Sequence, residues 1–205
     1  MASFLKKSIA AMPLQLRLAL APKFSDVPQT IADRSFRNWI SAHIHPAVRF
    51  FADKSELEEF ACARFRKTPL AWYGFGGDGA ALRRWAGLNT CSDSRFYNFA
   101  SSPVDCEDAR ARVFTGDYAD MLAQNMRLFN TSVPKLLHIG TGDYAATSAI
   151  LNTIGDTIDT RGIVMIEKFA DLQNDFRALQ DYGRPYLVLG ATSFFSHLAI
   201  RFAPR

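Results

Sequence analysis

The stretch LLHIGTGDYAATSAIL, residues 136–151, contains residue types that hold ligands or move protons. It reads as a strand that ends near Gly140 and a helix that begins near Asp143. Open α/β sheets bind ligands where a strand ends and a helix starts. His138 lies inside the predicted strand, and imidazole and carboxylate groups act as general bases in enzymes. The stretch therefore indicates a ligand-binding turn, or a turn that has lost its ligand.

A second turn of this kind follows the aromatic segment LAWYGF, residues 70–75. It contains four glycines and one acid, namely Gly74, Gly76, Gly77, Gly79 and Asp78. Glycine lets the backbone approach a ligand closely, and an aspartate at such a position caps the following helix. The same glycines also suit a tight strand-to-helix turn that binds nothing. We predict this turn as a cofactor-binding segment and keep the purely structural interpretation beside it.

Strands and helices alternate from Pro69 to the C-terminus. We predict strands at residues 70–75, 95–100, 112–116, 135–140, 162–169, 185–190 and 195–202. Alternation of this kind favours a mostly parallel sheet with crossover helices. The last two strands leave no room for a helix between them, so they should form an antiparallel hairpin. The fold class is therefore α/β, a Rossmann-like sheet of seven strands.

The chain before residue 69 has helical patterns. Apolar residues from Phe36 to Phe51 recur at nearly helical spacing, which predicts one helix over this range. A second helix follows, with Asp53 or Ser55 available as its N-cap. We divide the chain into a helical extension, residues 1–68, and an α/β domain, residues 69–205.

Composition narrows the functional classes. The 205 residues are 48% hydrophobic and carry a net charge of +4, without a dense Lys/Arg stripe, so we predict no nucleic-acid partner. The three cysteines, Cys62, Cys91 and Cys106, form no CxxC pair, and only His43 and His45 lie close together. This pattern does not support a disulfide framework or a zinc site and is typical of an intracellular protein.

The first 25 residues hold Lys6, Lys7, Arg17 and Lys23 and no acid. Such a segment is typical of mitochondrial targeting or of a helix that contacts a membrane surface. It is equally compatible with a helix that packs on its own domain or on a partner. We predict an intracellular location, mitochondrial if the segment targets the chain and cytoplasmic otherwise.

Four segments in order resemble one family. LAWYGFGGDGAA, FYNFASSPVD, VFTGDYADML and the stretch from LLHIGTGDY to IVMIEKF are similar to successive motifs of the macrocin O-methyltransferase family, between about residues 70 and 169. That family belongs to the class I methyltransferases, which use S-adenosylmethionine. The resemblance implies the class I fold, this cofactor and a small-molecule acceptor.

The chain departs from the family where the family has acids. Those positions here hold Trp72, Tyr97, Gly140, Gly142 and Lys168, while Glu167 is retained and Asp143 lies one place beyond its motif position. Tyr97 would then be a vestigial cofactor contact, because a neutral phenol replaces the acid that accepts hydrogen bonds from ribose. We predict no metal site, since Mg²⁺ needs clustered oxygen ligands. Lys168 would pair with Glu167 or point to solvent.

These losses favour a degenerate, non-catalytic methyltransferase fold that serves as an interaction or structural subunit, with no cofactor. A protein partner, and a mitochondrial assembly if the N-terminus is a targeting segment, would follow. The alternative is an active small-molecule O-methyltransferase that uses S-adenosylmethionine without a metal. His138, Asp143 or Glu167 would then be its base. A third hypothesis is a module that binds another nucleotide or metabolite at the same sheet edge.

Overall fold

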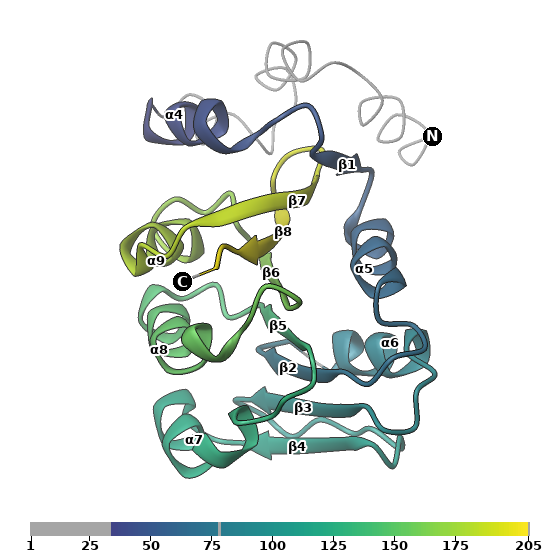
Figure 1. The fold of residues 1–205 in the computed structure, drawn as a ribbon. Coiled ribbons are helices and arrows are strands. Elements are labelled where there is room, and N and C mark those ends of the chain that lie inside the picture. Colours follow the sequence, from purple (N-terminus) through teal and green to yellow (C-terminus); the bar gives the residue numbers. More distant parts are fainter. Residues whose placement is uncertain (1–33, 78, 205) are drawn as a thin grey trace, which may run out of the picture.

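The computed structural model describes residues 34–77 and 79–204 (Figure 1). Eight strands form one sheet in the order β1-β7-β8-β6-β5-β2-β3-β4. The strands are β1 Arg49–Phe51, β2 Ala71–Phe75, β3 Arg95–Ala100, β4 Ala111–Thr115, β5 Lys135–Ile139, β6 Ile163–Glu167, β7 Tyr186–Thr192 and β8 His197–Phe202. The α-helices are α4 Arg34–His43, α5 Lys54–Ala63, α6 Ala80–Leu88, α7 Tyr118–Gln124, α8 Tyr144–Ile154 and α9 Asp175–Tyr182. Two 3₁₀ turns, η2 Met126–Phe129 and η3 Gly155–Thr157, complete the described elements.

The predicted α/β class is confirmed. All seven predicted strands are present, and β8 alone runs antiparallel, between β6 and β7. The remaining pairs are parallel. Parallel neighbours are joined by helices except between β3 and β4, which only the irregular segment 101–110 connects.

The helix predicted from Phe36 to Phe51 is wrong in its second half. Helix α4 ends at His43, and Arg49–Phe51 forms strand β1, which pairs in parallel with β7. Pro46 explains the break, because it lacks an N–H and disfavours helical backbone at the residue before it. The sheet therefore has eight strands and not seven.

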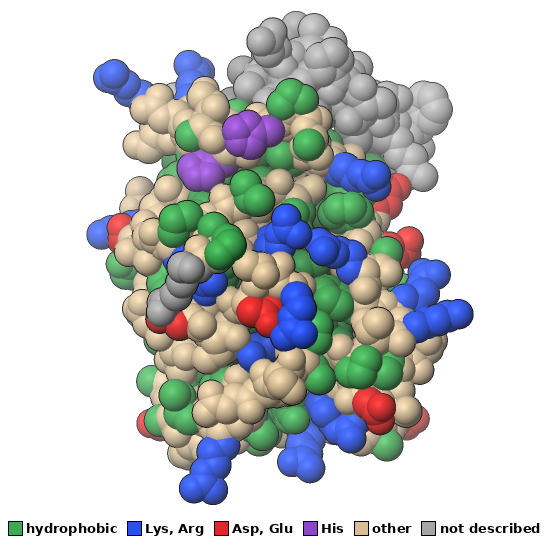
Figure 2. Space-filling view, in the orientation of Figure 1, with side chains coloured by type: hydrophobic (Ala, Val, Ile, Leu, Met, Phe, Trp, Pro, Cys, Tyr) green, Lys and Arg blue, Asp and Glu red, His purple; other side chains and the backbone are tan. Residues whose placement is uncertain are grey.

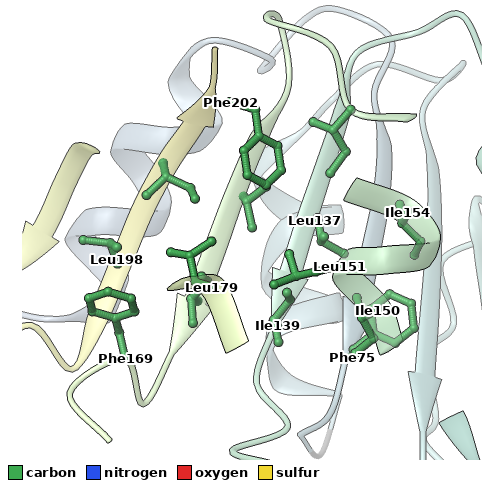
Figure 3. Packing of buried hydrophobic residues seen from close by; sticks show 14 of the residues in the cluster. Phe75, Leu137, Ile139, Ile150, Leu151, Ile154, Phe169, Leu179, Leu198 and Phe202 are labelled. Atoms are coloured by element: carbon green, nitrogen blue, oxygen red, sulfur yellow. The ribbon is translucent and has the colours of Figure 1, made fainter. Parts of the chain in front are cut away.

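Helices cover both faces of the sheet. In Figure 1, α5 and α6 lie on one face, and α7, α8 and α9 lie on the other. Side chains alternate between the faces along each strand, so two separate apolar clusters form. Figure 3 shows Ile150, Leu151 and Ile154 of α8 against Leu137 and Ile139 of β5.

Helix α4 is bound to the sheet domain by aromatic contacts. The Trp39 ring lies 4.8 Å from the ring of Phe169 and stacks on Phe36 at 5.4 Å between centroids. Its Nε1 donates a hydrogen bond of 2.7 Å to Tyr186 Oη at the start of β7. Only 4% of Trp39 is exposed. The helix therefore contributes directly to the core.

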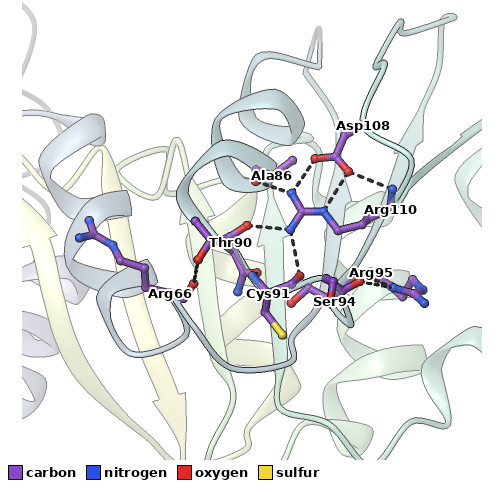
Figure 4. A network of polar contacts seen from close by, with 10 residues as sticks. Arg66, Ala86, Thr90, Cys91, Ser94, Arg95, Asp108 and Arg110 are labelled. Carbon is purple, nitrogen blue, oxygen red and sulfur yellow. Dashed lines mark hydrogen bonds and ion pairs between the residues drawn. The ribbon is translucent and has the colours of Figure 1, made fainter.

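Arg110 fixes the helix-free connection between β3 and β4 (Figure 4). Its five N–H groups all donate hydrogen bonds, to the carbonyls of Ala86, Asn89 and Cys91 and to both carboxylate oxygens of Asp108. Its guanidinium also lies 5.0 Å from the centre of the Phe96 ring. The end of α6 and the start of β4 are thus joined by one side chain.

We predict that Trp39→Ala lowers the free energy of unfolding by about 3–5 kcal/mol, the usual cost of truncating a buried Trp. Met126→Ala is the control, because Met126 is 48% exposed and should change stability little. Urea unfolding followed by far-UV circular dichroism measures both. Equal stability of the two variants would mean that α4 is not part of the cooperative fold.

Candidate functional site

The carboxyl ends of β2, β5 and β6 meet around one small cavity. The cavity has a volume of about 160 Å³. Five of the residues singled out from the sequence line it, namely Gly74, Gly76, Gly77, His138 and Glu167. Lys54, Trp72 and Phe75 also line it. The structure thus brings these five predicted residues together, and nothing in the sequence indicated that Lys54 lies beside them.

The glycines after β2 are required by the backbone. Gly76 and Gly77 have φ values of +91° and +80°, and Gly79, the N-cap of α6, has +82°. A Cβ on Gly76 would lie 2.8 Å from the carbonyl of Gly140, because the turns after β2 and β5 touch. These residues are glycines for conformational reasons whether or not a ligand binds. The predicted cap Asp78 lies outside the described residues.

Trp72 occupies the space above the end of β2. The side chain is fully buried, and a Cβ on Gly74 would lie 2.0 Å from its Cη2 atom. The indole also meets the His138 ring edge-on, with 5.8 Å between centroids. Among the described atoms neither Trp72 Nε1 nor His138 Nδ1 has a hydrogen-bond partner. A large ring therefore fills the volume beside the glycine turn.

Glu167 is bonded to two groups of this chain. Its Oε1 contacts Lys54 Nζ and lies 2.8 Å from His138 Nε2. Burial alone would raise the pKa of Glu167, but the hydrogen bonds and positive charge supplied by His138 and Lys54 outweigh burial and lower that pKa to about 2. A carboxylate with so low a pKa is a poor general base at neutral pH.

A second buried acid extends this charge cluster. Glu58 is 1% exposed, and burial raises the pKa of its carboxyl group. Arg84 Nε lies 2.8 Å from Glu58 Oε2, and Lys54 Nζ lies 3.8 Å from Glu58 Oε1. Two cations therefore face two carboxylates between α5, α6 and β6. The spacing of Lys54 and Glu58 indicates a helical pair, but no sequence signal connects this pair to Glu167.

Lys168 does not pair with Glu167. Its backbone is left-handed, with φ of +52°, and its side chain is exposed. A Cβ on Gly142 would lie 2.9 Å from Lys168 Nζ, so the lysine passes over the turn after β5. The sequence left two positions for Lys168, either paired with Glu167 or pointing to solvent. Its side chain is exposed, and Lys54 pairs with Glu167 instead.

Asp143 and Tyr97 lie away from the cavity. Asp143 is the N-cap of α8, and its Oδ1 accepts a hydrogen bond of 2.8 Å from the Ala146 amide. Tyr97 lies within β3, three residues before the strand ends, and stacks on Tyr73 at 5.4 Å. Both side chains have structural contacts that account for their positions.

Sequence reasoning missed Asp175, an acid buried between the turns after β5 and β6. It is 0% exposed, and burial raises the pKa of its carboxyl group to about 6. Thr147 Oγ1 donates a hydrogen bond of 2.6 Å to Asp175 Oδ1 and lies 2.8 Å from Thr141 Oγ1. No periodicity or motif distinguishes this aspartate from the exposed acids around it.

No group of three or more His, Cys, Asp or Glu side chains in residues 34–77 and 79–204 is arranged to hold a metal ion. In the same part of the chain, no helix is long and apolar enough to cross a bilayer.

Comparisons with known proteins show the fold. Neither the family models nor the curated proteins give a match. Among solved structures, CalS11, a TDP-rhamnose 3'-O-methyltransferase of calicheamicin biosynthesis, is 15% identical over 93% of both chains with a TM-score of 0.54. TomG, an O-methyltransferase from Streptomyces achromogenes solved with S-adenosylmethionine, is 13% identical over 94% of this chain and 100% of its own, with a TM-score of 0.53. MycE, solved with Mg and S-adenosylhomocysteine, is 15% identical over 81% of this chain and 54% of its own, with a TM-score of 0.51. The chain therefore has the fold of the class I methyltransferases.

We predict that Gly74→Ala destabilises the protein by about 1–3 kcal/mol, because the added Cβ overlaps the Trp72 ring. In a Trp72→Leu background, Gly74→Ala should lower the free energy of unfolding by less than it does in the wild-type background. Gly87→Ala is the matched control, since a Cβ there meets nothing within 4 Å, and it should stabilise α6 by about 0.5–1 kcal/mol. Urea unfolding of wild type, Gly74→Ala, Trp72→Leu, the double variant and Gly87→Ala tests this, and a Gly74→Ala protein as stable as wild type would show that Trp72 does not lie over Gly74.

Asp175 should make stability depend on pH. Its pKa is about 6 when folded and about 3.9 when unfolded, so between these values the folded chain holds a proton that the unfolded chain has released. Protonation of Asp175 then stabilises the fold as pH falls from 7 toward 4. Asp175→Asn removes this contribution, and its stability relative to wild type should fall by about 2–3 kcal/mol over that range.

The exposed Asp120→Asn serves as the control for this titration and should follow the wild-type pH profile. Free energies of unfolding in urea, measured from pH 4 to pH 8, give the comparison. Parallel profiles for Asp175→Asn and wild type would show that Asp175 titrates normally.

Proposed function

We propose that this chain is a methyltransferase fold that does not transfer methyl groups and serves as an interaction or structural subunit. One observation carries the proposal. Trp72 over Gly74 and the cluster of Lys54, Glu167 and His138 leave a cavity of about 160 Å³ beside the glycine turn. Sites for ligands of the cofactor's size typically enclose about 300–1,000 Å³. This small volume supports a chain that does not bind S-adenosylmethionine while Trp72 and Lys54 keep their observed positions.

The residues that would bind the cofactor's ribose also support the proposal. The end of β3 and the following turn, residues 98–102, read NFASS and contain no carboxylate. In this type of sheet an acid near that point accepts hydrogen bonds from the ribose hydroxyls. A hydrogen bond to a charged group contributes about 1.5–3 kcal/mol, which corresponds to roughly a tenfold to a hundredfold loss of affinity.

The charges around Glu167 oppose a metal ion. Mg²⁺ prefers several oxygen ligands, and Glu167 is already bonded to the ammonium of Lys54. A second cation at this carboxylate would be repelled by Lys54 or would have to displace it. Within residues 34–77 and 79–204, neither the ligand set nor the charge around Glu167 supports a metal-dependent transfer.

The second candidate is an active small-molecule O-methyltransferase that needs no metal. The position of His138 at the cavity favours it. CalS11 and TomG, which share the fold, are named as O-methyltransferases. This candidate requires Trp72 and Lys54 to leave their observed positions when the cofactor enters.

The partner under the first proposal is a protein. A mitochondrial location, and contact of the N-terminal segment with a membrane surface, remain proposals that rest on the basic residues 1–25, which lie outside the described residues. Only the second candidate, the active O-methyltransferase, requires a small-molecule acceptor.

Calorimetric titration with S-adenosylmethionine and S-adenosylhomocysteine, with and without Mg²⁺, tests the proposal. We expect no heat of binding and no thermal shift at millimolar ligand. TomG, solved with S-adenosylmethionine, is the positive control. Micromolar binding by this chain would overturn the proposal and favour the second candidate.

A further inference from the structure

A groove lies at the opposite edge of the sheet, where β2, β5 and β6 begin. Its volume is about 390 Å³. The segment after α5 forms one wall and the turns before β5 and β6 form the other. The residues that define it are Arg64, Phe65, Pro69, Val133, Pro134 and Arg161. The groove therefore combines an apolar floor with a guanidinium on each side.

Both walls are fixed by hydrogen bonds. Asn89 Nδ2 donates to the carbonyls of Phe65 and Thr68, at 2.5 and 3.2 Å. Thr90 donates from its amide and its hydroxyl to the Arg66 carbonyl, a contact that Figure 4 draws. Across the groove, Arg161 Nη2 donates to the Ser132 carbonyl at 2.9 Å. A rigid groove loses little conformational entropy when a ligand binds.

The first wall has an excess of positive charge. Arg64 lines the groove, and Arg66 and Lys67 follow it in the chain without lining the groove. All three are exposed, and none of them forms an ion pair with a carboxylate in the described part of the chain. Arg161 is balanced by Asp159, at 2.6 Å. Figure 2 shows Lys and Arg side chains spread widely over the visible face, with fewer acids between them. The groove is therefore suited to an anionic ligand.

The chain's own N-terminal segment does not match this charge. Residues 1–25 contain basic side chains and no acid, so Arg64, Arg66 and Lys67 would repel them. A nucleic acid is disfavoured by the floor, because Phe65 is only 4% exposed and offers no ring face for bases to stack on. A protein segment with carboxylates matches both the positive charge of Arg64 and the apolar lining of Pro69, Val133 and Pro134.

We propose that this groove binds an acidic segment of a partner protein. An aliphatic side chain of the segment packs on the half-buried Pro69, Val133 and Pro134, and its flanking carboxylates pair with Arg64 on the wall and with Arg66, two residues further along the chain. The inference rests on the proposed function as an interaction subunit and assigns that interaction to the amino edge of the sheet. The partner's contact is thus on the edge opposite the filled cavity.

Selection from a library of random heptapeptides, displayed on phage and panned on the immobilised full chain, tests the inference. Enriched sequences should place Asp or Glu on both sides of a Leu, Ile or Val. The enriched peptides are then synthesised with a fluorescent label, and their binding is measured by fluorescence polarisation at 50 and 300 mM salt. Binding should weaken at the higher salt, because exposed charge pairs are screened.

Two double variants carry the same change in charge. Arg64→Glu with Arg66→Glu should weaken the peptides at least tenfold. Arg34→Glu with Arg112→Glu, at exposed cations on α4 and β4, should change binding less than twofold. Equal losses in both variants would mean general charge attraction, and failure to enrich acidic peptides would mean no such groove function. Either result overturns the inference.

Sedimentation of the protein at several concentrations tests whether a second copy of this chain occupies the groove instead. Self-association that Arg64→Glu with Arg66→Glu abolishes would show that the groove takes acids of another copy and would overturn a separate partner. A single monomeric species leaves the groove free for the peptides. These results do not depend on the titration with S-adenosylmethionine, so the groove and the filled cavity can fail separately.

Discussion

The direction of the helices relative to the strands is the constraint on which both edges of this protein depend. Each crossover helix follows a parallel strand and returns antiparallel to it, so the helix N-termini gather at the carboxyl edge. Acids cap several of these helices there, including Asp53, Asp117 and Asp143. Carboxylates stabilise a helix N-terminus and cations a C-terminus. The fold therefore places these three capping acids at the carboxyl edge and Arg64, Arg66 and Lys67, which follow the end of α5, at the amino edge.

At the carboxyl edge, side chains of the chain itself surround the retained acid and the end of β2. The Lys54 ammonium faces Glu167, and the Trp72 ring covers Gly74. A buried carboxylate without a partner would be strongly destabilising, so Lys54 and Arg84 are needed if Glu58 and Glu167 stay ionised. The same contacts that stabilise this edge also reduce the space beside the glycine turn. Stability of this edge and the small volume of its cavity thus have one cause.

The amino edge has no comparable filling. Lys135 donates hydrogen bonds to the carbonyls of Thr131 and Thr157. Arg184 donates to the carbonyls of Gly155, Ile158 and Ala203. Arg64, Arg66 and Lys67 remain exposed beside a groove with an apolar floor. A surface of this kind differs from the carboxyl edge in both charge and shape. The two edges can therefore have separate roles in one small domain.

The sequence by itself determined the order of strands and helices along the chain and the positions of the two glycine-containing turns. The alternating strand and helix patterns and the residues Gly76 and Gly140 are local signals. It also located His138 and Glu167 at strands that end near those turns. Tertiary structure decided the rest. Pro46 is a local signal for the end of α4, but the pairing of Arg49–Phe51 with β7, 141 residues away between Arg49 and Gly190, is not. Lys54 reached Glu167 across 113 residues. Contacts between segments so distant depend on how the elements pack, and no local pattern of residue types encodes them.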